Sequence, residues 1–281
     1  MDDIIKVEKL SFSYKNNKIF DEFSLSIKRG SWVTIIGPNG GGKSTLLKIL
    51  MGELEHSGTV LIDGKEKDVE NPSNFYKKIY ILTEDPDDKF ISETVKEEIA
   101  FALENQKKKP SEIKQRVKEI ANEVGIVHLL NKSPYHLSGG EKQLVCIAAM
   151  LAHEPQVLLM DETLNRIDTE QKEKILSIIS RLKKDKNLTV VKTTHNSEEA
   201  LYSDEIIILD QGKIVLRGET VKVFSEEKIL TKLGIEIPFM ISLSLKLKYY
   251  NLLKDVELDM DKMVDKIWSW KIFRFHTKQQ F

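Results

Sequence analysis

Residues 37–44 read Gly37-Pro38-Asn39-Gly40-Gly41-Gly42-Lys43-Ser44, and the architecture of the chain follows from them. They fit the pattern of a glycine, four free positions, a second glycine, a lysine and a serine or threonine. An apolar run typical of a strand covered on both faces precedes them at 32–36, and a helical pattern follows at 44–51. Strand, glycine-rich loop and helix together form the context in which this pattern binds a nucleoside triphosphate.

The residue types suit the chemistry of phosphates. Three successive glycines let the backbone turn tightly and point its N–H groups inward. The following helix adds the positive end of its dipole, the lysine adds a mobile charge, and the serine hydroxyl suits Mg²⁺. The residues expected to bind the triphosphate are Gly37, Pro38, Asn39, Gly40, Gly41, Gly42, Lys43, Ser44 and Thr45.

A second apolar run, at 157–160, ends in two carboxylates, Asp161 and Glu162. The carboxyl ends of parallel strands meet where ligands bind, so Asp161 is placed to reach the Mg²⁺ shell together with Ser44. Glu162 is placed to orient or deprotonate an attacking water. A solvated acidic loop is the alternative for such a pair in isolation, and the phosphate-binding stretch favours the catalytic interpretation.

Residues 137–141, Leu-Ser-Gly-Gly-Glu, form another glycine-containing stretch before a helical pattern. The backbone of Ser138, Gly139 and Gly140 predicts an anion-binding nest that carries no lysine of its own. Such a nest is useful if it completes a site whose cation comes from another chain.

The remaining pattern indicates strands that alternate with helices, and therefore a parallel sheet. Two alternating stretches near the N-terminus predict strands at 4–14, near an edge, and at 20–27. Residues 92–151 form an inserted helical region. The other expected elements are strands at 157–160, 188–193, 205–209 and 214–216, with a hairpin turn at 210–213, and helices at 97–103, 111–124, 141–151, 169–184 and 197–202.

Composition narrows the class of protein. The 43 basic and 44 acidic residues nearly cancel, so bulk charge gives no indication of a nucleic-acid-binding surface. The single cysteine, Cys146, lies in an apolar stretch and is expected to be a buried small hydrophobe. The acidic N-terminus does not resemble a secretory leader, and no apolar stretch approaches the roughly 18 residues of a membrane span.

Together, these motifs resemble those of the ATP-binding cassette (ABC) ATPases over roughly residues 4–225. The stretch at 137–141 is the specific part, because other families with the phosphate-binding loop do not carry it there. The resemblance implies ATP and Mg²⁺ as ligands and an α/β P-loop NTPase fold: a RecA-like parallel sheet core, an antiparallel β subdomain, an inserted α-helical subdomain and a small C-terminal extension. The expected boundaries are 1–225 for the ATPase domain, with the helical subdomain at about 92–151, and 226–281 for the extension.

Family roles extend to three more positions. His195 fits the switch histidine that contacts the terminal phosphate, although an isolated histidine would more often be a surface or core residue. Tyr14 fits the aromatic that stacks on adenine, with strand-end packing as the alternative. Asp168 fits the aspartate of the loop at the dimer interface. The family's head-to-tail dimer places each ATP against the partner's signature, here Ser138, Gly139, Gly140 and Glu141.

Two positions depart from the family pattern. Glu84 stands where a glutamine is expected, and a carboxylate, unlike an amide, donates only when protonated. We hypothesise that Glu84 still acts catalytically as a metal or water ligand with altered metal dependence, which a Mg²⁺ titration of Glu84→Gln against the parent tests. Thr163 replaces the usual proline, and the next loop reads Asn-Arg-Ile-Asp at 165–168. Turnover is still expected because the other catalytic motifs remain.

Residues 85–90, 95–101 and 234–239 resemble the ATPases of energy-coupling factor (ECF) importers. That resemblance implies a peripheral protein on the cytoplasmic face of the cell membrane. Its partners would be a second ABC ATPase subunit, related or identical, a membrane T-component and a substrate-binding membrane S-component. The acidic cluster Glu84, Asp85, Asp87 and Asp88 is suited to basic helices of the T-component, with a solvated loop as the alternative.

The ECF importer implied by this resemblance would take up a vitamin or a metal ion. Two alternative functions are also open. One is the ATPase of another ABC transporter. The other is a nucleotide-gated structural subunit with little turnover, which Glu84 favours and the intact Glu162 and His195 oppose. The aromatic and basic tail at 266–281 is expected to pack on its own domain, with contact to a membrane or partner as the alternative.

Overall fold

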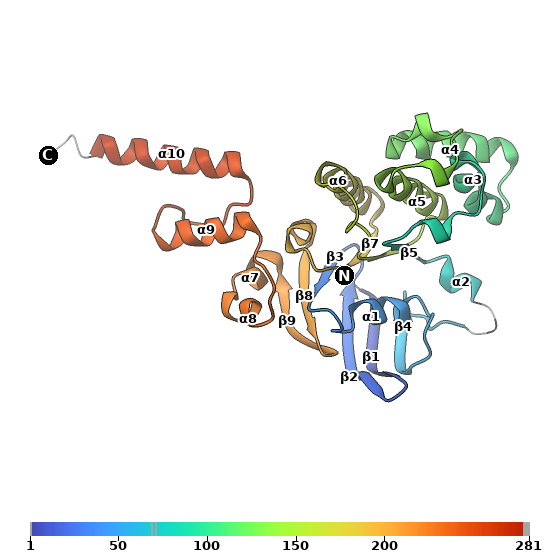
Figure 1. The fold of residues 1–281 in the computed structure, drawn as a ribbon, viewed down its shortest axis with the longest axis horizontal. Helices are drawn as coiled ribbons and strands as arrows, with labels where there is room; N and C mark the ends of the chain where they lie inside the picture. The colour runs from blue at the N-terminus through green and yellow to red at the C-terminus, as the bar shows by residue number, and fades with distance from the viewer. Residues whose placement is uncertain (1, 69, 71, 278–281) are drawn as a thin grey trace.

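The computed structural model describes residues 2–68, 70 and 72–277, and their side chains except those of 88 and 269–277. Its centre is a six-stranded sheet in the order β5-β6-β7-β3-β8-β9 (Figure 1). Five strands are parallel, and β9 pairs antiparallel with β8 as the edge strand. The bounds are Trp32–Ile36 for β3, Ile79–Thr83 for β5, Val157–Asp161 for β6, Thr189–Thr194 for β7, Glu205–Asp210 for β8 and Lys213–Glu219 for β9. The α/β expectation is therefore confirmed.

The register of this sheet brings functional positions into line. Thr83 at the end of β5 pairs with Asp161 of β6, and Asp161 pairs with Thr193 of β7. Because the three strands are parallel, the loops that leave them all begin at one edge. The phosphate-binding stretch leaves β3 at the same edge, where Ile36 pairs with Thr194.

A second, antiparallel sheet has the order β2-β1-β4, with bounds Asn17–Lys28, Asp3–Tyr14 and Ser57–Ile62. The expectation that 4–14 lies near an edge is wrong, because β1 is the middle strand. The sequence reasoning missed β4, whose short apolar part follows Gly58 and supplies the second neighbour of β1. It also missed β5, only five residues long. Buried side chains of both sheets pack with α1 (Lys43–Leu50) in one core.

The helical region consists of α3 (Val95–Asn105), α4 (Pro110–Val124) and α5 (Gly139–His153), which lie together at one end of the molecule (Figure 1). Its start is marked by Thr94, which caps α3 in a reciprocal capping box. Buried residues such as Leu103, Ile120 and Ile147 join these helices in one core with α6 (Thr169–Lys186). The shorter helical segments are α2 (Ser73–Tyr76), η1 (Asp87–Lys89), η2 (Val127–Leu129) and η3 (Pro134–His136).

The helix expected at 197–202 is a 3₁₀ helix, η4 (Ser197–Tyr202), whose tight turns pack close behind β7. Beyond β9 the chain forms α7 (Thr220–Phe224), α8 (Glu227–Lys232), α9 (Phe239–Tyr249) and α10 (Met260–Thr277), at the opposite end from α3–α5 (Figure 1). Among the helices in the described ranges, none has the length and apolar character needed to cross a bilayer.

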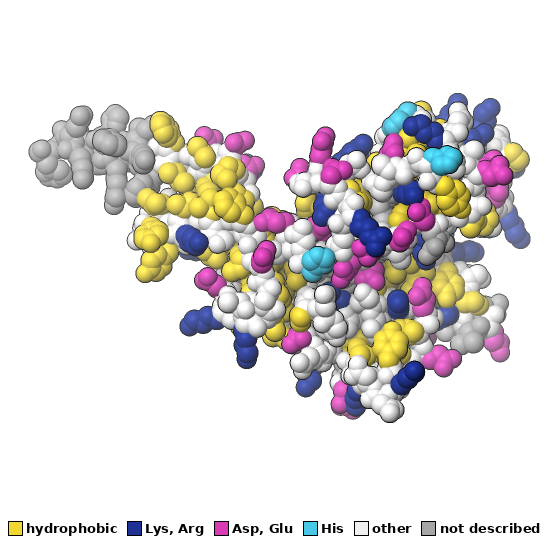
Figure 2. All heavy atoms as spheres, viewed as in Figure 1, with side chains coloured by type: hydrophobic (Ala, Val, Ile, Leu, Met, Phe, Trp, Pro, Cys, Tyr) yellow, Lys and Arg dark blue, Asp and Glu magenta, His cyan; other side chains and the backbone are white. Residues whose placement is uncertain are grey.

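Hydrophobic side chains gather on the surface of α9 and the start of α10 (Figure 2). Most of the tail at 266–281 lies outside the residues whose side chains are described, although Trp268 is included and is exposed. The packing expected of this tail therefore stays a prediction. The exposed apolar side chains over these helices are Phe239, Tyr249, Tyr250, Leu258, Met260, Val264 and Trp268.

Candidate functional site

The glycines of the phosphate-binding loop are required by its backbone. A Cβ added to Gly37 would lie 1.9 Å from the carbonyl oxygen of Leu209, so no side chain fits between β3 and β8 there. Gly42 has a φ of 104°, a conformation that other residues rarely adopt, and it stands directly before α1. Nothing lies within 4 Å of a Cβ built on Gly40, which leaves that part of the loop open to a ligand.

Lys43 is the first residue of α1, and its side chain folds back over this loop. Its Nζ donates to the carbonyl oxygens of Gly37, at 2.8 Å, and Pro38, at 3.1 Å. Burial lowers the pKa of Lys43, and the nearby carboxylates of Glu162 and Asp161 oppose that effect. The ammonium therefore has little water around it and is placed to exchange the loop carbonyls for phosphate oxygens.

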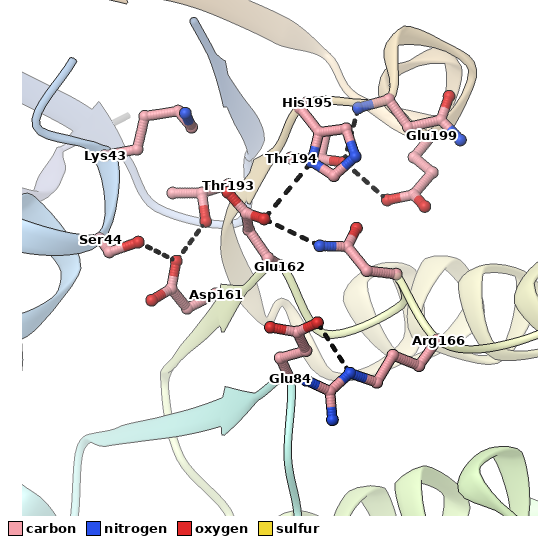
Figure 3. A network of polar contacts seen from close by, with 12 residues as sticks. Lys43, Ser44, Glu84, Asp161, Glu162, Arg166, Thr193, Thr194, His195 and Glu199 are labelled. Carbon is pink, nitrogen blue, oxygen red and sulfur yellow. Dashed lines mark hydrogen bonds and ion pairs between the residues drawn. The ribbon is translucent and has the colours of Figure 1, made fainter. Parts of the chain in front are cut away.

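Asp161 connects three elements at the sheet edge. Its Oδ1 accepts hydrogen bonds from Ser44 Oγ of α1, at 2.9 Å, and from Thr193 Oγ1 of β7, at 2.6 Å (Figure 3). Among the described residues, no cluster of three or more His, Cys, Asp or Glu side chains could hold a metal ion alone. The pair of hydroxyl and carboxylate nevertheless fits Mg²⁺, which binds through one or two protein ligands and completes its shell with phosphates and water.

Glu162 leaves β6 with a φ of 48°, a left-handed conformation that is uncommon for a residue with a side chain. Its Oε2 accepts a hydrogen bond from Asn165 Nδ2 at 2.8 Å and lies 3.4 Å from His195 Nδ1 (Figure 3). The turn thus directs the carboxylate toward the histidine that follows β7. His195 itself is exposed, and so is accessible to a ligand at this edge.

The pocket at this edge has a volume of about 520 Å³ and is predominantly acidic. Glu84, at the end of β5, faces Arg166, whose Nε lies 3.2 Å from Glu84 Oε1 (Figure 3). Four carboxylates would repel a triphosphate unless a divalent cation came with it. The lining residues are Ser44, Thr83, Glu84, Asp85, Lys89, Asp161 and Glu162.

Behind the site, β7 carries a buried ion pair. Lys192 Nζ lies 2.5 Å from Glu199 Oε2 of η4, and Thr194 Oγ1 donates to the same oxygen at 3.0 Å. Burial alone would raise the pKa of Glu199, but the attraction of Lys192 and its hydrogen bond hold that pKa below its ordinary value. The pair fastens the segment on either side of His195 to the core.

The signature stretch is arranged differently from the expected nest. Gly139 and Gly140 are the first residues of α5, so their N–H groups belong to a helix N-terminus, a site that also attracts anions. Ser138 caps the helix by accepting from Glu141 N at 3.4 Å, while Glu141 Oε2 accepts from Ser138 N at 2.9 Å. Ser138 and Gly139 are exposed.

Two further expected residues occupy local roles. Tyr14 is exposed at the end of β1, with its ring edge-on to Phe12 at 4.8 Å. Asp168 caps α6 by accepting from Gln171 N at 3.0 Å. Of the described residues, those lining the pocket include neither of these nor any member of the signature. The adenine contact, the dimer loop and the signature role therefore stay predictions.

Sequence reasoning missed several side chains that complete the site. Thr193 holds Asp161, Asn165 holds Glu162, and Arg166 faces Glu84. A hydroxyl two residues before His195 was the available signal for Thr193, and Asn165 and Arg166 stand in the loop that departs from the family pattern. A lysine inside an apolar strand was the signal for the buried pair of Lys192 and Glu199.

Comparisons with known proteins agree with this geometry. The model of the ABC transporter family matches residues 20–165. The energy-coupling factor transporter ATP-binding protein EcfA1 of Lactobacillus delbrueckii is 34% identical, over 95% of this chain and 98% of its own. The EcfA1 of Mycoplasmopsis synoviae is 38% identical, over 86% and 92%.

Two solved structures share the fold. One is CbiO1 of Clostridium perfringens, part of the ABC transporter complex CbiONQ, with a TM-score of 0.76 and 32% identity over 86% of this chain and 99% of its own. The other is the ATP-binding cassette MJ0796, a dimer in a post-hydrolysis state with ADP and Pi, with a TM-score of 0.69 and 27% identity over 77% and 98%. The chain therefore belongs to the ABC transporter ATPases, and among them to the energy-coupling factor ATP-binding proteins.

Proposed function

We infer that this chain is the ATP-hydrolysing subunit of an ECF-type importer, and we propose the following roles for its residues. The observation that carries the proposal is a pair of adjacent polar sets at the sheet edge: Ser44 and Thr193 on Asp161, and Asn165 and His195 on Glu162. Their members come from α1, from β7 and its following residue, and from the end of β6 with the loop after it, so only the folded sheet brings them together.

Binding begins at the phosphate loop. Lys43 leaves the carbonyls of Gly37 and Pro38 and contacts the outer phosphates, while N–H groups from Gly40 to Ser44 surround the inner ones. Ser44 and Asp161 would hold Mg²⁺, which when bound would neutralise phosphate charge and stabilise the leaving group. The pocket is lined by four carboxylates, which would repel the triphosphate. A bound divalent cation would offset this repulsion.

Hydrolysis is assigned to Glu162 and His195. The Glu162 carboxylate orients a water for attack on the terminal phosphorus and accepts its proton. Asn165 fixes that carboxylate with a hydrogen bond of 2.8 Å. His195, 3.4 Å from Glu162, contacts the terminal phosphate from the end of β7. Tyr14 is assigned to adenine on family resemblance.

The signature requires a second subunit, related or identical to this one. The start of α5 is exposed at Ser138 and Gly139, and the lysine of its first turn, Lys142, is paired with Asp87 at 2.6 Å. Its backbone N–H groups therefore complement a phosphate whose lysine belongs to the partner. In this proposal Ser138, Gly139, Gly140 and Glu141 contact the partner's ATP, with Asp168 in the adjoining loop. The dimeric state of the related cassette MJ0796 supports this arrangement.

The membrane partners are proposed from the relatives. CbiO1 is part of the complex CbiONQ, and the EcfA1 proteins are named for energy-coupling factor transporters. We assign this chain to the cytoplasmic face of the membrane, beside a T-component and a vitamin- or metal-selecting S-component. The acidic cluster near β5 is less free than its sequence suggests, because Lys142 lies 2.6 Å from Asp87 and Arg166 lies 3.7 Å from Asp85.

The test is ATP hydrolysis by the chain purified with its membrane partners. The parent assembly should hydrolyse ATP in a Mg²⁺-dependent manner, and Glu162→Gln should bind ATP and hold an ATP-dependent pair of subunits. Glu84 favours one alternative, a nucleotide-gated structural subunit. ATP-dependent pairing without hydrolysis in the complete assembly would support that alternative and reject the enzyme.

A further inference from the structure

The loop between Glu162 and α6 is held firmly at both ends. Leu164 and Ile167 are buried in the core, and Asp168 caps α6 through Gln171 N. Between the two buried residues, Asn165 and Arg166 are left to face the site. Their backbone is therefore fixed, and the direction of their side chains is a property of the fold.

These neighbouring residues hold two different carboxylates. Asn165 Nδ2 donates to Glu162 Oε2 at 2.8 Å, and Arg166 Nε lies 3.2 Å from Glu84 Oε1 (Figure 3). Arg166 Nη1 also lies 3.7 Å from Asp85 Oδ2. One short loop thus connects the glutamate that follows β6 with the one that follows β5.

The contact between Arg166 and Glu84 changes the charge of the pocket. Glu84 stands where an amide is expected, and it lines a pocket with three other carboxylates. A triphosphate that enters beside it meets an additional negative charge, which a guanidinium within 4 Å offsets. We propose that Arg166 is a positioning residue for Glu84, which neutralises and orients the carboxylate so that it can replace the amide beside Mg²⁺ and ATP. The inference rests on the proposed function of this site.

The pair is exposed, 70% at Arg166 and 40% at Glu84, so its effect is expected to be modest in water. Arg166→Ala should lower kcat/KM for MgATP by about fivefold, the usual upper range for an exposed pair. The Mg²⁺ concentration at half-maximal rate should fall, because Glu84 loses its competing cation. A merely structural role for Arg166 would not move that midpoint.

A double-mutant cycle tests the pair in the complete purified assembly. In the Glu84→Gln background, Arg166→Ala should change kcat/KM less than about twofold and leave the Mg²⁺ midpoint in place. Lys222→Ala is the matched control, since it removes an equally exposed cation from the remote Glu219. Equal losses from Arg166→Ala in both backgrounds would overturn the inference.

The inference and the proposed function fail separately. The same cycle is measured on the Kd of a fluorescent ATP analogue with Mg²⁺, which needs no turnover. If the parent binds the analogue but does not hydrolyse ATP, the enzyme proposal fails and the cycle on Kd still decides the role of Arg166. Coupling between the two positions supports the pair, and its absence from Kd and kcat/KM alike rejects it.

Discussion

The sheet edge that carries Lys43, Ser44, Asp161 and Glu162, here called the nucleotide edge, and the start of α5 are the two surfaces proposed to bind phosphate, and they are built in opposite ways. At the nucleotide edge the side chains are partly buried and hold one another, as in the contacts of Asp161 with Ser44 and Thr193. At the start of α5, Ser138 and Gly139 are exposed and Gly140 is buried, and the Ser138 side chain is occupied by capping its own helix. Lys43 provides a cation at the first surface, whereas at the second Lys142 is paired with Asp87, which leaves the backbone N–H groups to attract an anion.

This difference indicates that a single chain supplies most of the proposed ATP site at the sheet edge and needs a second chain to complete it. Lys43, the pair of Ser44 and Asp161 proposed to hold Mg²⁺, and the proposed catalytic carboxylate of Glu162 lie together at the sheet edge, so we expect one chain to bind a nucleotide there. A helix N-terminus without a cation contributes a fraction of a charge, which suits the closure of a site already occupied by nucleotide. Substitutions at the nucleotide edge should therefore change the affinity for ATP, and substitutions at the start of α5 should change the rate of ATP hydrolysis.

The largest expected effect is on the free energy of unfolding, at the buried ion pair of Lys192 and Glu199 that supports the nucleotide edge. Glu199→Gln leaves the fully buried Lys192 without its carboxylate, which should lower the free energy of unfolding by about 3–5 kcal/mol. Urea denaturation measures this. The double replacement Lys192→Met with Glu199→Leu removes both charges and should be close to neutral. An unchanged stability in Glu199→Gln would show that the pair does not support the edge.

The same pair predicts a loss of stability at low pH, and the double replacement separates it from other carboxylates such as Glu141 of α5, whose pKa is also lowered, chiefly by the hydrogen bond from the Ser138 backbone. The pKa of Glu199 in the folded protein lies below its ordinary value of 4.5, so its stabilising effect is complete above that pH. It is lost as pH falls through the lower, folded-state pKa. Unfolding measured between about pH 7 and pH 3 should therefore show a loss of stability that is smaller in the double replacement.

Affinity for nucleotide tests the edge directly. Lys43→Ala removes the loop cation and should weaken binding of a fluorescent ATP analogue by about 100-fold, or roughly 3 kcal/mol. Lys48→Ala, on the exposed face of the same helix, is the control and should bind normally. If both variants bind like the parent, the edge does not hold the triphosphate through this lysine.

The rate of ATP hydrolysis distinguishes Glu162 from the residues that only bind the nucleotide. Glu162→Gln should lower kcat by about 100-fold or more, because an amide cannot accept the proton of the attacking water. Its Kd for nucleotide should stay close to that of the parent. Glu173→Gln, on the exposed surface of α6, provides the matched control. A kcat unaffected by Glu162→Gln would assign the proton transfer to another group.

The sequence predicted the nucleotide edge better than its surroundings, and the reason is physical. Gly37, Lys43 and Asp161 are constrained by local geometry and by their place at strand ends, and such constraints leave patterns along the chain. The contacts of Thr193 with Asp161 and of Arg166 with Glu84 join segments far apart in sequence, so no local pattern records them. The contact of Asn165 with Glu162 spans three residues, but it depends on the left-handed turn at Glu162, which the sequence does not mark. The middle position of β1 likewise depended on a remote strand, β4.

The sequence predicted that Ser138, Gly139 and Gly140 form an anion-binding backbone, but it did not predict that the two glycines form the first turn of a helix. Two glycines after a serine suit either a nest or the first turn of a helix, and the alternatives differ only in the φ of the glycines. Neither Gly139 nor Gly140 has a positive φ, because Ser138 and Glu141 form a capping box that extends the helix to this point. The reciprocal bonds of that box decide the conformation.

The smallest effect is expected at Ser138, where capping and phosphate contact can be separated. Ser138→Ala loses the cap and should lower the free energy of unfolding by about 1 kcal/mol, whereas Ser138→Asp keeps the cap and should be nearly as stable as the parent. Both variants should bind the ATP analogue as single chains with parental affinity. The carboxylate of Ser138→Asp would face the partner's phosphate, so hydrolysis by the assembly should fall more in that stable variant than in Ser138→Ala. The reverse order would mean that Ser138 acts only as a helix cap, and that the exposed start of α5 does not close the ATP site.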